Sequence, residues 1–124
     1  LFHLSRQAAR IFSSFQEYDP FLWEAHHRHK ADAPSGTALS LRDILAESYA
    51  REWDIPSLRA GSIPGTHVVG FDSSADTLSL EHRARNRDGF ASGSLLAAQW
   101  LIEQSRAGRR GLFTMQDVIE EQLS

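Results

Sequence analysis

The sequence predicts an α+β domain in which a mixed, open β-sheet carries helices on one face. Apolar residues at helical spacing mark both ends of the chain, whereas short β-type runs separated by glycine and proline fill its middle. The resulting order is helix, strand, helix, several strands, helix and helix, which is typical of helices segregated to one side of a sheet. The other face of such a sheet needs a cover, so we expect it to be used for oligomerisation.

The composition is that of one soluble globular domain, and we assign residues 1–124 to it. Of the 124 residues, 41% are hydrophobic and 23% are charged, close to the average of such proteins. The net charge of -3 gives no reason to expect a nucleic acid or an anionic membrane as a partner, and no apolar run has membrane-spanning length. Cysteine is absent, which excludes disulfides, thiolate metal sites and cysteine nucleophiles and fits a cytoplasmic protein.

The first half of the chain is expected to form a helix, a strand and a second helix. The first helix ends near Phe15, because the residue before Pro20 is disfavoured in helical backbone. Residues 21–25 form a strand that runs into the polar cluster 26–30, and a turn over residues 32–37 leads into the second helix. The buried stripe of that helix consists of apolar residues at helical spacing, namely Leu41, Ile44, Leu45 and Tyr49.

The second half is expected to form strands and then two helices. Residues 56–87 form an antiparallel meander that contains two β-type runs, 68–69 and 78–80. A third helix runs from Phe90 to about Ile102. Thr114 caps a short final helix from Met115 to Glu121.

Residues 24–38 concentrate the chemically active side chains. They place histidines and a lysine at the end of a strand and follow them with the start of a helix. Histidine exchanges a proton near neutral pH, and lysine is a compact cation with three donors. The segment Ser35-Gly36-Thr37 offers backbone amides and hydroxyls at the positive end of the helix dipole, where an anion binds well. These groups together suit an anionic substrate that needs a proton.

Other interpretations of the same residues stay open. Three histidines in four residues could hold a metal ion, although no spaced partner pair or acidic ligand set accompanies them. The cluster could be a solvated loop, and Ser35-Gly36-Thr37 could cap the helix and do nothing more. A Ser-His hydrolase is disfavoured because no Gly-x-Ser-x-Gly elbow occurs, although Asp32, Ser35 and the histidines are present.

The segment Glu24–Ala38 resembles the signature of the dihydrodipicolinate reductases, Glu-x-His-His-x-x-Lys-x-Asp-x-Pro-Ser-Gly-Thr-Ala. Residues 82–93, with His82-Arg83-Ala84-Arg85-Asn86-Arg87 and Phe90-Ala91-x-Gly93, are similar to the strand-to-helix junction of that family, except that Asn86 stands where serine is usual. Residues 111–118 resemble its usual C-terminal ending. The likeness spans nearly the whole chain.

The resemblance implies the NAD(P)H-dependent reduction that yields tetrahydrodipicolinate in lysine and diaminopimelate synthesis. His26 would be the proton donor and Lys30 the second catalytic group. The groups that would bind the dicarboxylate substrate are His27, Ser35, Gly36 and Thr37. The family uses NADH or NADPH, and it assembles as a homotetramer through the free faces of its sheets. We expect no metal in this chain.

The glycine-rich fingerprint that cradles a dinucleotide does not occur in this chain. In the family it lies in an N-terminal Rossmann domain, so we expect the chain alone to be inactive. The alternative is a non-catalytic dicarboxylate-binding or assembly module of the same fold, which would not need the titrating acid that His26 provides. A metal-binding regulatory domain is a third interpretation.

Alternation along strands gives two further expectations. Arg83, Arg85 and Arg87 would share one face of a strand. That face is expected to be solvated or to form an interface, because the negative net charge and the lack of interleaved aromatic residues disfavour nucleic acid. If the earlier strand continues beyond Glu24, residues 26, 28 and 30 lie on one side and His27 on the other. Trp53 and Trp100 are interpreted as core or interface anchors.

Overall fold

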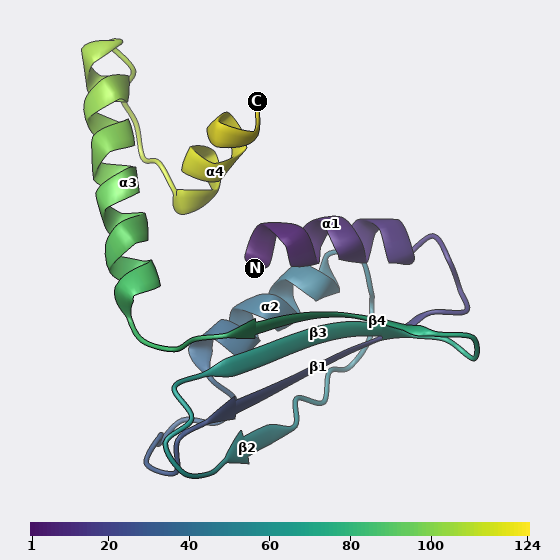
Figure 1. The fold of residues 1–124 in the computed structure, drawn as a ribbon. Coiled ribbons are helices and arrows are strands. Elements are labelled where there is room, and N and C mark those ends of the chain that lie inside the picture. Colours follow the sequence, from purple (N-terminus) through teal and green to yellow (C-terminus); the bar gives the residue numbers. More distant parts are fainter. The chain divides into compact units, whose positions relative to one another are not determined.

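The structure is a computed structural model that describes residues 1–124, and it forms two compact units, Leu1–Arg85 and Asn86–Ser124. The first unit contains two helices and four strands (Figure 1), namely α1 (Phe2–Phe12), β1 (Asp19–His26), α2 (Gly36–Ala46), β2 (Ser57–Arg59), β3 (Thr66–Asp72) and β4 (Thr77–Arg83). The second unit contains the remaining helices, α3 (Asp88–Arg106) and α4 (Met115–Leu123). The assignment of all 124 residues to one substrate-binding domain stays a prediction.

The four strands form one mixed, open sheet, as the sequence predicts. Their order is β2-β1-β3-β4, with β1 and β2 parallel and the other two pairs antiparallel. The expected meander is correct for β3 and β4, which are joined by a tight turn. The third strand, β2, instead runs parallel to β1, because α2 lies between them in the chain and carries it back to the same end of the sheet.

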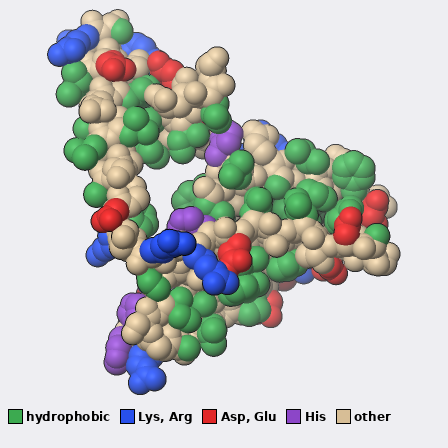
Figure 2. Space-filling model, viewed as in Figure 1, with side chains coloured by type: hydrophobic (Ala, Val, Ile, Leu, Met, Phe, Trp, Pro, Cys, Tyr) green, Lys and Arg blue, Asp and Glu red, His purple; other side chains and the backbone are tan.

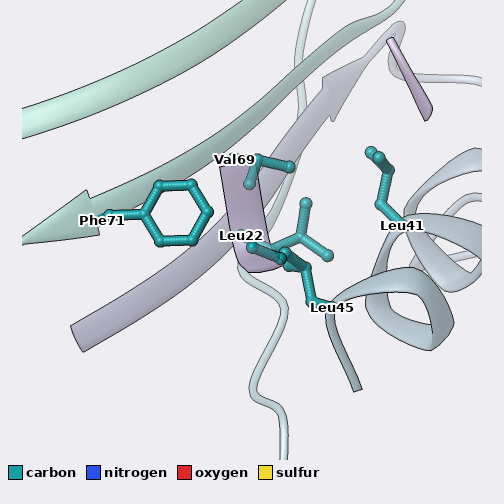
Figure 3. Packing of buried hydrophobic residues seen from close by; sticks show 6 residues of the cluster. Leu22, Leu41, Leu45, Val69 and Phe71 are labelled. Atoms are coloured by element: carbon teal, nitrogen blue, oxygen red, sulfur yellow. The ribbon is translucent and has the colours of Figure 1, made fainter. Parts of the chain in front are cut away.

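The core of the first unit lies between the sheet and its two helices. Figure 1 shows α1 and α2 over the same face of the sheet, which confirms the predicted placement of these helices. Figure 3 shows Leu22, Val69 and Phe71 of the sheet pointing toward Leu41 and Leu45 of α2. All five side chains are at most 1% exposed. Burial of such side chains contributes about 1.5–3 kcal/mol each to folding, so this layer holds the strands and helices together.

Alternate residues of β1 point to the opposite face, which no helix of this unit covers. Trp23 and Phe21 are only partly buried there, and Leu58 of β2 is 55% exposed. Gly70 of β3 pairs with Phe21, and the phenyl ring lies directly over it. A Cβ atom at Gly70 would be 2.0 Å from Cζ of that ring. Glycine is therefore needed for the ring to lie flat on the strand.

Several element ends differ from those expected. Helix α1 ends at Phe12 rather than Phe15, because the Ser13 hydroxyl bonds to the carbonyl of Arg10 and the chain turns there. Tyr49 lies beyond the end of α2, although it packs on the core as expected, as does Trp53.

The predicted arginine stripe is wrong. Strand β4 ends at Arg83, and although the amide of Ala84 still donates to the carbonyl of Gly65 in the register of the sheet, residues 85–87 form a bend. Arg87 is the N-cap of α3, and the Asn86 side chain accepts a hydrogen bond from the amide of Asp88. Arg83, Arg85 and Arg87 therefore do not share a strand face.

The second unit is a pair of helices joined around one indole. Trp100 is 3% exposed, and its ring nitrogen donates to Glu121 of α4, which confirms its role as an anchor. The predicted cap of α4 is also present, since Thr114 and Asp117 form a capping box. None of the helices in the structure combines the length and apolar character needed to cross a membrane.

Replacing Gly70 by Ala should destabilise the first unit by about 1–3 kcal/mol, because the new methyl group meets the Phe21 ring and forces it outward. Urea unfolding measures the change. In a Phe21→Ala background the same substitution should cost much less, since the obstructing ring is gone. Equal costs in the two backgrounds would contradict this packing.

Candidate functional site

The candidate site lies where β1, β2 and β3 meet the beginning of α2. Glu24 of β1 pairs with His67 of β3, and His26 pairs with Arg59 of β2. Paired residues in a sheet point to the same face, so all four side chains lie on the face that carries the helices. Figure 2 shows histidine and basic side chains gathered at the end of this unit where β1 and β2 finish.

Glu24 is a fully buried carboxylate with four hydrogen-bond partners. Both terminal nitrogens of Arg59 donate to it, at 2.7 and 2.9 Å, and the amide of Ser35 donates at 3.2 Å. Nδ1 of His26 lies 2.5 Å from its Oε2. Burial alone would raise the pKa of Glu24, but the hydrogen bonds, that from Arg59 first, outweigh burial and lower the pKa to about 2. Glu24 is therefore ionised throughout the neutral range.

His67 is the second buried titratable group of the site. Its Nε2 lies 2.8 Å from the Ser35 hydroxyl, and its ring stands edge-on to that of His26 with 5.1 Å between centroids. Burial and the neighbouring His26 lower the pKa of His67 to about 4, although Glu24 acts in the opposite direction. His67 is therefore neutral near pH 7 and adds no charge to the site.

The start of α2 is built as the sequence predicts. Ser35 is the N-cap, and its hydroxyl accepts from the amide of Ala38 at 3.1 Å. The amides of Gly36 and Thr37 belong to the first turn, where backbone donors have no partner within the helix. A Cβ atom at Gly36 would meet no other atom within 4 Å. The space beside Gly36 is therefore open.

Residues 27–30 turn away from the strand direction. Strand β1 ends at His26, and the Lys30 amide donates to the carbonyl of His27, so the expected alternation over positions 28 and 30 is wrong. His27 lines a shallow depression with Arg28, His29, Gly61 and Ser62. The Lys30 ammonium lies 2.8 Å from Asp32, and 24% of its side chain is exposed.

The structure thus brings together some of the predicted site residues. His26 and Ser35 belong to one buried network, and Lys30 is close enough to influence the charge of His67. His27 lines the depression that also includes Gly61 and Ser62, and no residue of the start of α2 lines it. The sequence analysis assigned no role to Glu24, Arg59 or His67. A signal existed for Glu24, an acid two residues before His26 in an apolar strand, but the pairing that brings in the other two was not predicted.

Three of these side chains have the donor atoms of a metal site. One ligand atom each from Glu24, His26 and His67 lie within 4.8 Å of one another. The Arg59 guanidinium, however, occupies both oxygens of Glu24. A metal ion would have to displace this cation, so the donor set fits a proton-handling network better than a cation site.

The two pKa shifts predict how stability depends on pH. His67 binds its proton less readily in the folded state than in the unfolded state, so its contribution is complete above pH 6.5 and is lost as the pH falls toward 4. The contribution of Glu24 is complete above pH 4.5 and is lost toward pH 2. Urea unfolding should show stability falling below pH 6.5 with a slope of up to about 1.4 kcal/mol per pH unit.

A His67→Gln variant should lose the slope between pH 6.5 and 4, and a His29→Gln variant should keep it, because His29 is exposed. An unchanged slope in the His67 variant would show that another group is responsible.

Comparison with known proteins places these features in a family. The family described as "Dihydrodipicolinate reductase, C-terminus" matches residues 1–119. Two relatives are named 4-hydroxy-tetrahydrodipicolinate reductase. That of Syntrophus aciditrophicus is 41% identical over 83% of this chain and 44% of its own length, and that of Akkermansia muciniphila is 39% identical over 96% and 54%. The chain spans about half the length of the curated relatives it matches.

A solved structure supports the fold. The dipicolinate-bound dihydrodipicolinate reductase of a Paenisporosarcina species aligns with a TM-score of 0.67 and 24% identity, over 82% of this chain and 46% of that one. The family match extends over both compact units, from the first helix into α4. This chain belongs to the dihydrodipicolinate reductase family and corresponds to its C-terminal part.

Proposed function

We propose that this chain is the substrate-binding and catalytic part of an NAD(P)H-dependent 4-hydroxy-tetrahydrodipicolinate reductase of lysine and diaminopimelate synthesis. The observation that carries this proposal is a buried histidine, His26, held by an ionised carboxylate next to the open start of a helix. Such a site binds an anion and supplies a proton to it. A dicarboxylate ligand is supported by the Paenisporosarcina enzyme, which is described as dipicolinate-bound.

His26 is the proposed proton donor. Hydride addition to an unsaturated substrate leaves an electron-rich atom that must take up a proton, and histidine is suited to give one near neutral pH. Lys30 is the proposed second catalytic group. The Lys30 side chain is partly exposed and its ammonium pairs with Asp32. The flexible side chain can turn from that partner toward a substrate carboxylate.

The amides of Gly36 and Thr37 are the proposed seat of a substrate carboxylate, because they lie at the positive end of α2 and the space beside Gly36 is open. The Ser35 hydroxyl is already hydrogen-bonded to the Ala38 amide and to His67, so it would contribute less to substrate binding than the two amides. The role proposed for His27 rests on the family likeness.

The chain's own residues do not form a dinucleotide site, because it has no glycine-rich turn between a strand and a helix. NADH or NADPH, as the source of hydride, would be held by a domain outside residues 1–124. No metal is proposed, since Arg59 holds the carboxylate that a cation would need. This chain's part of the reaction is to bind and orient the substrate and to deliver a proton.

A cytoplasmic homotetramer is proposed as the working form. The sheet face opposite the helices has a shallow apolar depression lined in part by Trp23, Ala25 and Leu58. Together with the partly exposed Phe21, these side chains suit burial against a second copy of the same sheet. The alternative function, a dicarboxylate-binding module without catalysis, would not require the buried pair of Glu24 and His26.

Replacing His26 by Gln should lower kcat of the complete reductase by about 10²–10⁴-fold and change KM little, because a positioned general acid acts mainly in the chemical step. Steady-state kinetics with the purified enzyme measure both constants. His29→Gln is the matched control, since His29 is exposed. A normal kcat in the His26 variant would remove this residue from the mechanism and favour the binding module.

The anion seat can be tested on this chain alone by NMR titration with a planar dicarboxylate such as dipicolinate. The amides of residues 35–37 should shift at millimolar ligand, and less at high salt, because charge pairing in a half-open site is screened over about 8 Å at physiological ionic strength. Gly36→Val should abolish these shifts by filling the open space. Gly89→Val is the control, because Gly89 also lies in the first turn of a helix with open space around it. Shifts no larger than those of distant amides would exclude the seat.

A further inference from the structure

One carboxylate fixes the proposed proton donor. Building on the function proposed above, we propose that Glu24 is a positioning residue. It keeps a proton on Nδ1 of His26, so that Nε2 is the atom that delivers the proton to the substrate, and Arg59 holds Glu24 in place for this task. The 2.5 Å contact between Oε2 of Glu24 and Nδ1 of His26 carries the inference.

The bonding of Glu24 leaves one tautomer for His26. An ionised carboxylate can only accept hydrogen bonds, and a guanidinium can only donate them. With Arg59 donating to both oxygens, Oε2 of Glu24 must also accept from Nδ1 of His26. Nδ1 therefore carries hydrogen in both charge states of the ring. Nε2 is the only ring nitrogen whose proton can come and go.

Nε2 of His26 makes no hydrogen bond in the structure, in contrast to Nδ1. It lies against Gly65, where an added Cβ atom would stand 3.0 Å from it. The φ angle of this glycine, +156°, is one that other residues adopt with strain. Any other residue at position 65 would place its Cβ atom against Nε2, whereas glycine leaves that edge of the ring free for a substrate.

Arg59 lowers the free-energy cost of proton release from His26. If Glu24 were held by His26 alone, loss of the Nε2 proton would leave a buried carboxylate without a counter-charge, which costs several kcal/mol. The Arg59 guanidinium neutralises Glu24 in either state of His26. Arg59 also donates to the carbonyl of Asp32 at 2.7 Å, so the same cation ties down the loop that follows the histidines.

His26 gives its proton to the substrate in a single transfer. The Nε2–H bond of the His26 imidazolium breaks, the proton goes to the substrate atom made electron-rich by hydride addition, and a neutral imidazole with Nδ1–H remains. The hydride would be supplied by a bound reduced nicotinamide. The titratable groups that act directly on His26 are Glu24 and His67. Further charged or titratable groups act on these partners or on Arg59, namely Lys30, His82 and Asp32.

The tautomer can be observed in the unmodified chain. Two-bond ¹H–¹⁵N correlation spectra of the histidines, recorded above the titration of His26, should assign its neutral form as Nδ1–H. The Nδ1 proton should resonate far downfield, because it lies in a short bond to a carboxylate. An Nε2–H tautomer for His26 would overturn the proposal without any reference to enzymatic activity.

Kinetics of the complete reductase test the consequence. Glu24→Gln should lower kcat at least about 10-fold with little change in KM, since removing the carboxylate that orients a catalytic histidine weakens catalysis strongly. The alkaline limb of the pH–kcat profile should move to lower pH, because the imidazolium loses its anionic partner. Glu24→Asp, which retains the charge, should restore the position of that limb.

A double variant separates positioning from structure. If Glu24 acts through His26, the Glu24→Gln change should not lower kcat further in a His26→Gln background. An equal further loss there would overturn the inference and make Glu24 a structural residue. Normal kinetics of Glu24→Gln beside an impaired His26→Gln would overturn this inference alone, whereas normal kinetics of His26→Gln would overturn the proposed function itself. If Glu24→Gln does not fold, the tautomer measurement and the Glu24→Asp profile decide.

Discussion

The buried ion pair between Glu24 and Arg59 is the interaction on which the site depends. It joins neighbouring strands β1 and β2, and through the Ser35 amide and the Asp32 carbonyl it also fixes the loop that leads into α2. Burying two charges is costly unless every bond is made. Here the carboxylate is bonded to three residues, Arg59, Ser35 and His26, whereas Nε of Arg59 is buried without a hydrogen-bond partner. Removal of either charge would leave the other one buried and unpaired.

The short parallel strand β2 owes its importance to this pair. It contributes three residues to the sheet and little to the hydrophobic core. Its register nevertheless sets Arg59 beside His26, within reach of Glu24. A meander, as the sequence suggested, would have left this arginine elsewhere. The parallel crossover through α2 is thus a requirement of the site as well as a feature of the topology.

Sequence reasoning succeeded where the signal was local. The helix start after residues 32–37, the buried stripe of α2 and the cap at Thr114 depend on residues close together in the chain, and each was predicted. Which residue caps α2 was left open and proves to be Ser35. The roles of Glu24, Arg59 and His67 depend on contacts between distant parts of the chain. Glu24 and Arg59 are separated by 35 positions, and Glu24 and His67 by 43, so no periodicity reveals these contacts. The predicted alternation of side chains between the two faces of the sheet was also wrong beyond His26 and beyond Arg83, because both strands end at these residues.

The candidate site has a rigid half and an open half, and the division follows from the chemistry required of each. A proton donor must be held in one tautomer and one orientation, and His26, the proposed donor, lies on a strand between buried partners. Groups that admit and release a substrate cannot be sealed in this way, and Lys30 and His27 accordingly lie on a turn that is partly exposed. Such a half-open site exposes its bound anion to water, which weakens every charge interaction in it. Charge interactions in the site therefore reach their full strength only when a further surface covers the open half and excludes water.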